Sequence, residues 1–216
     1  MKSNVTELVF ILDRSGSMSG LESDTIGGYN AFLKKQKKLE GTAYVTTVLF
    51  DDEYELLHDR ENIKEVKPVT EKEYFVRGCT ALMDAIGKTI HKISETQRKL
   101  TKKKRADQVI FVITTDGLEN ASVEYSVGKV KSLIEQYQKE EDWQFIFLGA
   151  NINAVETASQ MGIQRERAIN FHADSKGLEV NYKVINEAVT GLRMENCLRS
   201  DWAEEIEQDF ESRKVD

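Results

Sequence analysis

The sequence contains very little of three things that would place it in a special structural class. It has 2 cysteines, Cys79 and Cys197, which offer neither a disulfide framework nor the spacing of a metal-binding thiol set. It has 1 proline and no stretch rich in glycine and serine, so no interdomain linker is indicated. No segment approaches the roughly 18 uncharged apolar residues that span a bilayer. These absences favour a single globular domain.

Charge and the N-terminus limit the compartment and the partners. Residues Met1 to Asn4 lead into the first expected strand without the hydrophobic segment of a secretory signal, and we expect a cytoplasmic protein. The formal net charge of −7 argues against nucleic acid or an anionic membrane as the main partner. The basic run Arg98 to Arg105 is compatible with a nucleic-acid patch. A solvated helix end is favoured, because no aromatic residues are interleaved.

Apolar strand patterns alternate with amphipathic helix patterns along the chain. Strands are expected over residues 8–12, 43–50, 53–58, 109–113, 143–148 and 168–171. Helices are expected from a capping box at Ser19–Glu22 to about residue 39, and over residues 80–98, 123–138, 154–161 and 178–192. A hairpin at Asp51-Asp52 makes the third strand antiparallel. The pattern predicts an α/β fold, namely a doubly wound, Rossmann-like three-layer sandwich with a mostly parallel sheet and helices on both faces.

Three polar segments follow the two most apolar strands or open a helix. The first strand ends in Asp13-Arg14-Ser15-Gly16-Ser17, the second apolar run ends in Thr114-Thr115-Asp116-Gly117, and Gly78-Cys79-Thr80 opens a helix. If the two strands are neighbours, all three segments meet at one edge of the sheet. Oxygen donors on tight turns suit a hard cation such as Mg²⁺. By itself, the first segment is equally compatible with a Ser/Gly turn in which Asp13 caps a helix.

Taken together and in this order, the three segments resemble the metal-ion-dependent adhesion site (MIDAS) of the von Willebrand factor type A (vWA) domain family. All five expected positions are filled in this sequence, and the resemblance covers the chain from about residue 5 to residue 192. It implies a stand-alone vWA domain over residues 1–195, followed by an acidic amphipathic tail over residues 196–216. The five positions are Asp13, Ser15, Ser17, Thr80 and Asp116.

The resemblance implies a role for each of these residues. Ser15 and Ser17 would bind the metal directly, and Thr80 would bind it directly or through water. Asp13 and Asp116 would hold coordinated waters or the metal itself. The implied ion is Mg²⁺, with Mn²⁺ or Ca²⁺ as alternatives, and an open coordination position would accept an Asp or Glu of a partner protein. The implied function is a metal-dependent protein-interaction or adaptor module, not an enzyme.

Neighbouring residues leave alternatives open. Arg14, Asp51, Asp52 and Gly117 are candidates for the rim of the crevice, although a plain turn is favoured for the two aspartates. A metal-dependent phosphohydrolase using the same acidic crevice is the alternative function. Against it, the motif segments supply no evident general base and no Lys/Arg clamp for phosphate. The three histidines are interpreted as surface residues: His58, His91 and His172.

Two further features have a structural interpretation. Gly27-Gly28 lowers the helix propensity of the first helix, and a close approach of another backbone is one possible reason. In the tail, Trp202, Ile206 and Phe210 have helical spacing. We expect this apolar stripe to pack on the body of the domain, with a homodimer through the tail as the alternative.

Overall fold

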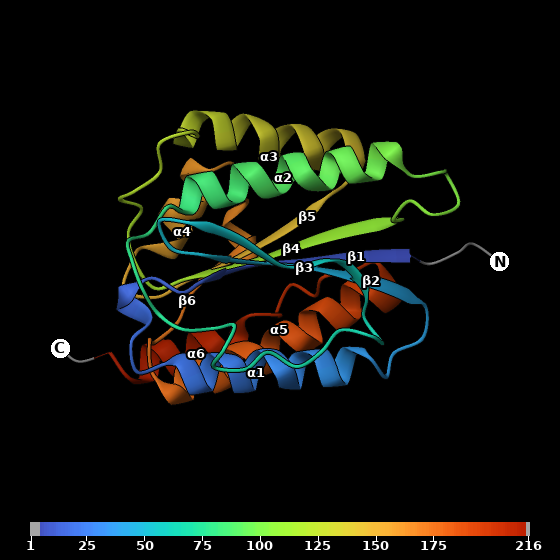
Figure 1. Cartoon of the computed structure of the whole chain (residues 1–216). Helices are drawn as coiled ribbons and strands as arrows, with labels where there is room; N and C mark the ends of the chain where they lie inside the picture. The colour runs from blue at the N-terminus through green and yellow to red at the C-terminus, as the bar shows by residue number, and fades with distance from the viewer. Residues whose placement is uncertain (1–4, 215–216) are drawn as a thin grey trace.

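A computed structural model describes residues 5–214. The N-terminal lead-in, Met1 to Asn4, and the last two residues of the tail lie outside the described residues. Within the described range, one 6-stranded sheet forms the centre of the molecule (Figure 1). Its strands are β1 (Val5–Asp13), β2 (Thr42–Phe50), β3 (Tyr54–Asn62), β4 (Gln108–Thr115), β5 (Gln144–Gly149) and β6 (Ala168–Asn170). They lie in the order β3-β2-β1-β4-β5-β6, with β3 antiparallel and all other pairs parallel. The predicted fold class is confirmed.

The two most apolar strands lie side by side at the centre of the sheet. Every residue of β1 is buried, and β4 is buried from Val109 onward. β1 pairs with β4 so that Leu12 lies opposite Thr114. Continuous apolar runs of this kind are typical of parallel strands that are covered on both faces. The residues that follow β1 and β4 therefore emerge at the same edge of the sheet.

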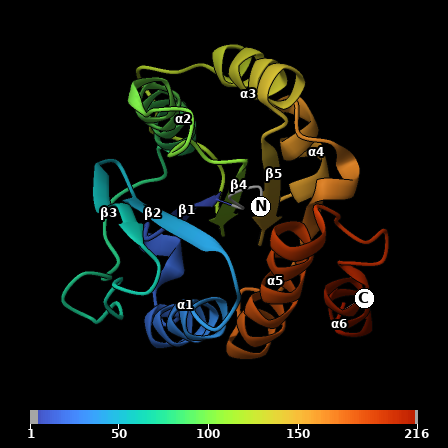
Figure 2. The ribbon, with the colours of Figure 1, turned by 90° about the vertical axis from the view of Figure 1, so that its right-hand side faces the viewer.

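Helices cover both faces, as the view along the sheet shows (Figure 2). One face carries α1 and α5, and the other carries α2 and α3. Side chains of β1 alternate between the two cores: Phe10 belongs to the core under α1 and α5, and Ile11 to the core under α2 and α3. The helices are α1 (Glu22–Gln36), α2 (Leu82–Lys99), α3 (Val127–Glu141), α4 (Ala154–Gln160), α5 (Ser175–Glu195) and α6 (Glu204–Ser212).

Several helix starts differ from the prediction, and the structure gives a physical reason for two of them. α1 begins without a side-chain cap, and the carboxylate of Glu22 accepts a hydrogen bond from the N–H of Gly20 (2.7 Å), so the capping box at Ser19 is wrong. α3 begins at residue 127 and not at 123. The Asp84 carboxylate accepts the backbone N–H groups of residues 123–125 at 2.8 to 3.0 Å and holds them in a loop. A side chain from α2 thus competes with helix formation there.

The glycine pair in α1 has one constrained member. A Cβ atom on Gly28 would lie 2.1 Å from the ring of Tyr182 on α5, whereas a Cβ on Gly27 would meet nothing within 4 Å. The close approach is therefore made by an aromatic side chain and not by a backbone. Gly28 lets α1 and α5 pack with the Tyr182 ring between them.

The C-terminal tail forms α6, which packs against α5 and the edge strand β6. Ile206 is buried, and the indole N–H of Trp202 donates to the carbonyl of Glu166 (2.8 Å). An exposed ion pair joins Lys183 of α5 to Glu205 of α6 (2.7 Å). The apolar side of the tail is thus directed at the body of the domain.

Candidate metal site

Asp13, the last residue of β1, orients the first loop. One carboxylate oxygen accepts the backbone N–H of Ser15 (2.7 Å), and the other accepts the hydroxyl of Thr115 at the end of β4 (2.6 Å). The hydroxyl of Tyr74 donates to the Asp13 carbonyl (2.6 Å). Burial raises the pKa of Asp13 above its ordinary value, because desolvation disfavours the carboxylate. Asp13 therefore joins the loop after β1 to the end of β4.

Ser15, Ser17 and Asp116 form a continuous set of oxygen atoms. The hydroxyls of Ser15 and Ser17 lie 3.1 Å apart, and the Ser17 hydroxyl donates to Oδ1 of Asp116 (2.5 Å). Oδ2 of Asp116 is buried and has no hydrogen-bond partner among residues 5–214. Burial raises the pKa of Asp116 to about 6, and the negative charge of Asp13 adds to the effect. A buried carboxylate oxygen without a donor is expensive unless a cation or another donor satisfies it.

Thr80 reaches the same point from the loop that precedes α2. A Cβ atom on Gly117 would lie 3.2 Å from the hydroxyl oxygen of Ser17 and 3.6 Å from that of Thr80, so both hydroxyls approach the backbone after Asp116. The N–H of Gly16 donates to the carbonyl of Gly78 (3.2 Å), which joins the loop after β1 to the Thr80 loop. The structure therefore brings all five predicted site residues together.

Asn120 fixes the position of Thr80. The backbone N–H of Thr80 donates to the side-chain oxygen of Asn120 (2.9 Å), and the N–H of Asn120 donates back to the carbonyl of Thr80 (3.0 Å). The same carbonyl also accepts the N–H of Ala121 (3.3 Å). The loop that carries Asp116 thus holds the loop that carries Thr80.

The structure separates the four predicted rim residues into two groups, and the prediction is wrong for the two that are buried. Gly117 borders the hydroxyls, and Asp52 is exposed. Arg14 and Asp51, in contrast, are fully buried and form an ion pair (2.9 Å). Arg14 also pairs with Glu55 (2.6 Å), so two of its guanidinium nitrogens are engaged with the β2–β3 hairpin, while Nη2 is buried without a hydrogen-bond partner among residues 5–214. The sequence around Arg14 could not reveal its burial, because the carboxylates that pair with it belong to the β2–β3 hairpin.

Sequence reasoning missed several residues and misplaced one histidine. Thr115 stands directly before Asp116, and its position at the strand end was a signal that it faces the site. Asn120 gave no comparable signal, because its role depends on how the loop turns back.

His58 is buried and not on the surface; its Nδ1 lies 3.0 Å from the Thr47 hydroxyl. His91 is exposed, and His172 is half-buried with Nε2 3.0 Å from a carbonyl of α6.

The donor set fits a hard divalent cation. Hydroxyl and carboxylate oxygens converge from three loops, and one buried carboxylate oxygen has no donor. Oxygen ligands of this kind suit Mg²⁺ or Mn²⁺. Within residues 5–214 no group of three or more His, Cys, Asp or Glu side chains is placed to hold a metal ion. A cation at this edge would therefore depend on hydroxyl ligands as well as on the two aspartates.

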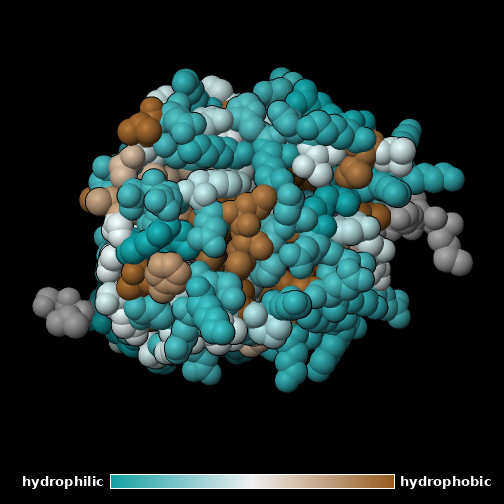
Figure 3. Space-filling view, in the orientation of Figure 1, coloured by the Kyte–Doolittle hydropathy of each residue, from teal (hydrophilic) through white to brown (hydrophobic). Residues whose placement is uncertain are grey.

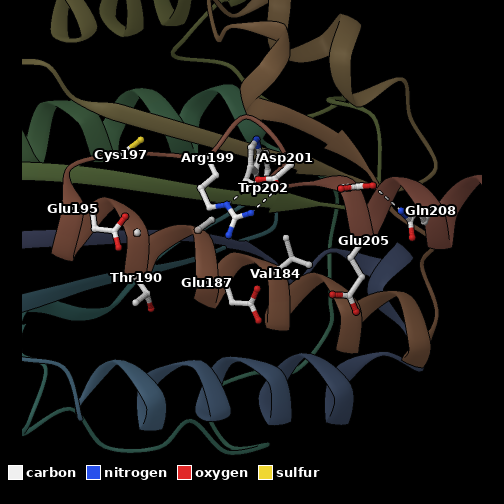
Figure 4. A pocket seen from close by; sticks show the side chains of 13 residues that line it. Val184, Glu187, Thr190, Glu195, Cys197, Arg199, Asp201, Trp202, Glu205 and Gln208 are labelled. Atoms are coloured by element: carbon white, nitrogen blue, oxygen red, sulfur yellow. Dashed lines mark hydrogen bonds and ion pairs between the residues drawn. The ribbon is translucent and has the colours of Figure 1, made fainter.

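A hollow of about 740 Å³ lies elsewhere, between α5 and the segment that leads into α6 (Figure 4). Figure 4 shows acidic side chains of α5 and α6 and the Arg199–Asp201 pair around it. None of the five predicted site residues lines it. The hollow is therefore separate from the candidate metal site.

Solved structures share the fold of this chain. Proximal thread matrix protein 1 from the mussel byssus, with a zinc-occupied MIDAS motif, has a TM-score of 0.57 and 14% identity over 87% of this chain and 46% of its own. The PilB minor pilin from Streptococcus sanguinis (D319A mutant) has a TM-score of 0.59 and 11% identity over 87% of this chain and 62% of its own. A von Willebrand factor type A structure from Catenulispora acidiphila has a TM-score of 0.57 and 11% identity over 88% of this chain and 43% of its own.

The chain spans about half the length of these neighbours, or somewhat more for the pilin. Neither family models nor curated proteins match it by sequence. At these identities the likeness shows the fold alone, which is the vWA-type Rossmann-like fold.

Proposed function

We propose that this chain is a metal-dependent protein-interaction module. A divalent cation, Mg²⁺ in the first instance and Mn²⁺ or Ca²⁺ as alternatives, would be held at the edge of the sheet where β1 and β4 end. Its site would consist of the hydroxyls of Ser15, Ser17 and Thr80 and the two carboxylates of Asp13 and Asp116. When bound, the ion would supply a coordination position for a carboxylate of a partner protein. The zinc-occupied MIDAS of the mussel protein supports this proposal.

The observation that carries the proposal is the partnerless Oδ2 of Asp116 beside the converging hydroxyls. Two carboxylates nearly neutralise a divalent cation, while hydroxyl ligands withdraw little of its charge. The cation would therefore still attract one more anionic ligand. Asp13, with both oxygens already engaged, would position the Ser15 loop and contribute charge.

Titration calorimetry with Mg²⁺ and Mn²⁺ tests the metal site. Wild type should bind one equivalent, and Asp116→Ala and Ser17→Ala should bind at least about tenfold more weakly, because each removes a ligand from the constellation. Ser17 is exposed, so its replacement should leave the fold intact. Asp201→Ala, which removes an exposed carboxylate paired with Arg199 in the tail, is the matched control. Equal affinity in wild type and both site variants would remove the proposal.

A further inference from the structure

Large exposed apolar side chains gather around the candidate metal site. The structure exposes five of them among residues 5–214, and four lie on segments at this edge of the sheet. Phe75 precedes the Thr80 loop, Leu118 follows Gly117, Val123 lies in the same loop as Leu118, and Val127 opens α3. Their exposed fractions are 43%, 69%, 89% and 38%, whereas the fifth, Met194, is at the opposite end of α5 at 45%. Scattered apolar residues need no explanation, but a concentration at one edge does.

The space-filling view shows one face of the molecule. The surface is mostly hydrophilic, and hydrophobic spots lie on the left, where β1 ends and α2 begins, as well as at the centre and on the right (Figure 3). The spots are separated by polar surface and form no broad apolar face. Such a pattern fits contacts with a few side chains of a partner better than a large obligate interface.

The loop that carries Leu118 and Val123 is held in place, so their exposure is part of the fold. The carboxylate of Glu119 accepts the N–H groups of Met83, Ala121 and Ser122 at 2.8 to 3.0 Å. Asp84 accepts the N–H of Val123 (3.0 Å). Two buried or half-buried carboxylates therefore anchor the loop on both sides of its apolar residues. A preordered apolar contact loses little entropy when it is covered.

Phe75, on the segment that precedes the Thr80 loop, lies beside two guanidinium groups. Its ring centroid is 5.5 Å from the Arg14 guanidinium carbon and 5.6 Å from that of Arg77. Arg77 pairs with Asp51 (2.7 Å), and its side chain is 40% exposed. The Phe75 ring thus packs against two guanidinium groups, while 43% of the residue is exposed to solvent. Arg77 also pairs with Glu53 (2.5 Å), so this side of the rim offers an apolar surface beside ion-paired guanidinium groups.

We infer that the partner of this site is a protein segment in which an acidic residue is flanked by bulky apolar residues. The inference rests on the proposed function, because the acidic residue would occupy the position offered by the metal ion. The apolar neighbours would cover Leu118 and Val123 on one side and Phe75 on the other. A small anion such as phosphate would leave these side chains uncovered. An acidic residue in a polar segment would gain nothing from them.

Selection from a library of random displayed peptides tests this chemistry. The full chain is immobilised with Mn²⁺, and bound peptides are eluted with EDTA. The expected peptides carry Asp or Glu with Leu, Ile, Val, Phe, Trp or Met within two positions. Chelator-eluted peptides with an acidic residue among polar neighbours would overturn this inference and leave the proposed function standing. No chelator-dependent capture at all would overturn both.

A variant comparison then locates the apolar contact. Leu118→Ser should bind a selected peptide about five- to tenfold more weakly, since it removes most of one buried apolar side chain. Its Mn²⁺ affinity, measured by calorimetry, should equal that of wild type. Met194→Ser, which changes an exposed apolar residue at the far end of α5, should change neither affinity. Unchanged peptide affinity in Leu118→Ser would overturn the inference.

Discussion

Two buried acidic side chains show how their partners decide what a carboxylate does. Glu7, in the first half of β1, has both oxygens satisfied: one accepts the Thr46 hydroxyl (3.0 Å), and the other accepts Arg60 (2.9 Å) and Gln97 (3.2 Å). Asp116 has one oxygen satisfied by Ser17 and one without any partner. A fully partnered buried carboxylate holds elements together, whereas a partly partnered one requires an explanation, and the proposed cation supplies one for Asp116.

Glu7 should make stability depend on pH. Burial raises its pKa to about 7 from an ordinary value of 4.5, and the nearby Arg60 only partly offsets this. The stability contribution of a group with a raised pKa is fully present below its unfolded pKa and is lost as the pH rises through the folded one. We therefore compare the unfolding free energy of wild type with that of Glu7→Gln at each pH. The value for wild type minus the value for Glu7→Gln should fall by up to about 3 kcal/mol between pH 4.5 and about pH 8.

Urea denaturation at a series of pH values checks this dependence. Glu179→Gln, at an exposed position of α5, is the control and should follow wild type throughout. A difference between wild type and Glu7→Gln that stays constant over this pH range would show that Glu7 is ionised throughout. The Arg60 ion pair would then lower the pKa of Glu7 by as much as burial raises it.

At the level of secondary-structure elements, α1 and α5 are joined by side chains that must interlock. The ring of Tyr182 occupies the space above Gly28. Near the other end of α1, Gln36 donates to the side-chain oxygen of Asn186 (2.7 Å) and accepts from Arg193 (2.8 Å). These two contacts lie at different positions along the helix axes, so together they resist sliding of α1 along α5.

The adjacent glycines of α1 give a matched pair of substitutions. Gly28→Ala should lower the unfolding free energy by about 1 to 3 kcal/mol, because the new methyl group collides with the Tyr182 ring. Gly27→Ala should raise it by about 0.5 to 1 kcal/mol, because alanine favours a helix and open space surrounds this position. Denaturant unfolding measures both. Equal effects of the two substitutions would contradict the packing of Tyr182 on Gly28.

The loops at the edge of the sheet support a third prediction. Asn120→Ala should weaken Mn²⁺ binding about tenfold in calorimetry, because the N–H of Thr80 loses its acceptor and the Thr80 hydroxyl its fixed position. Asn153→Ala is the matched control, since Asn153 accepts the N–H of Glu156 (3.1 Å) at the start of α4 and touches none of the five site residues. If both variants bind Mn²⁺ like wild type, Asn120 does not position Thr80.

Local patterns were sufficient for the order of elements and for the expectation that the five predicted site residues meet at one edge of the sheet. The apolar runs of β1 and β4 specify central strands, and parallel pairing then places Asp13 and Asp116 at one edge. The burial of Arg14 and His58 could not be predicted this way. Arg14 depends on carboxylates of the β2–β3 hairpin, and His58 on Thr47 across the same hairpin. The packing of Tyr182 on Gly28 likewise depends on two helices far apart in sequence.

On the scale of the whole molecule, the two ends of the sheet differ in character. The edge where β1 and β4 end carries the five oxygen-bearing side chains and, among the described residues, four of the five exposed large apolar residues. The opposite end carries the basic segment of residues 98–105, in which Lys102 to Arg105 are exposed. Within residues 5–214, no helix combines the length and the apolar character needed to cross a membrane. The proposed function places the contacts with a partner at the first edge.

The site is assembled from loops that are distant in sequence, so a bound ion would link them only in the folded state. Ligands that bind the native state alone stabilise it in proportion to the logarithm of their concentration over Kd. Added Mg²⁺ should therefore raise the melting temperature of wild type. It should leave the melting temperature of Asp116→Ala unchanged.

The most direct measurement is a crystal structure of wild type grown with Mn²⁺, with anomalous difference density collected to locate the ion. We expect one strong peak, coordinated by the hydroxyls of Ser15 and Ser17 and lying beside Thr80 and Asp116. Hydroxyls that remain bonded to each other, with no peak between the three loops at saturating Mn²⁺, would contradict the account.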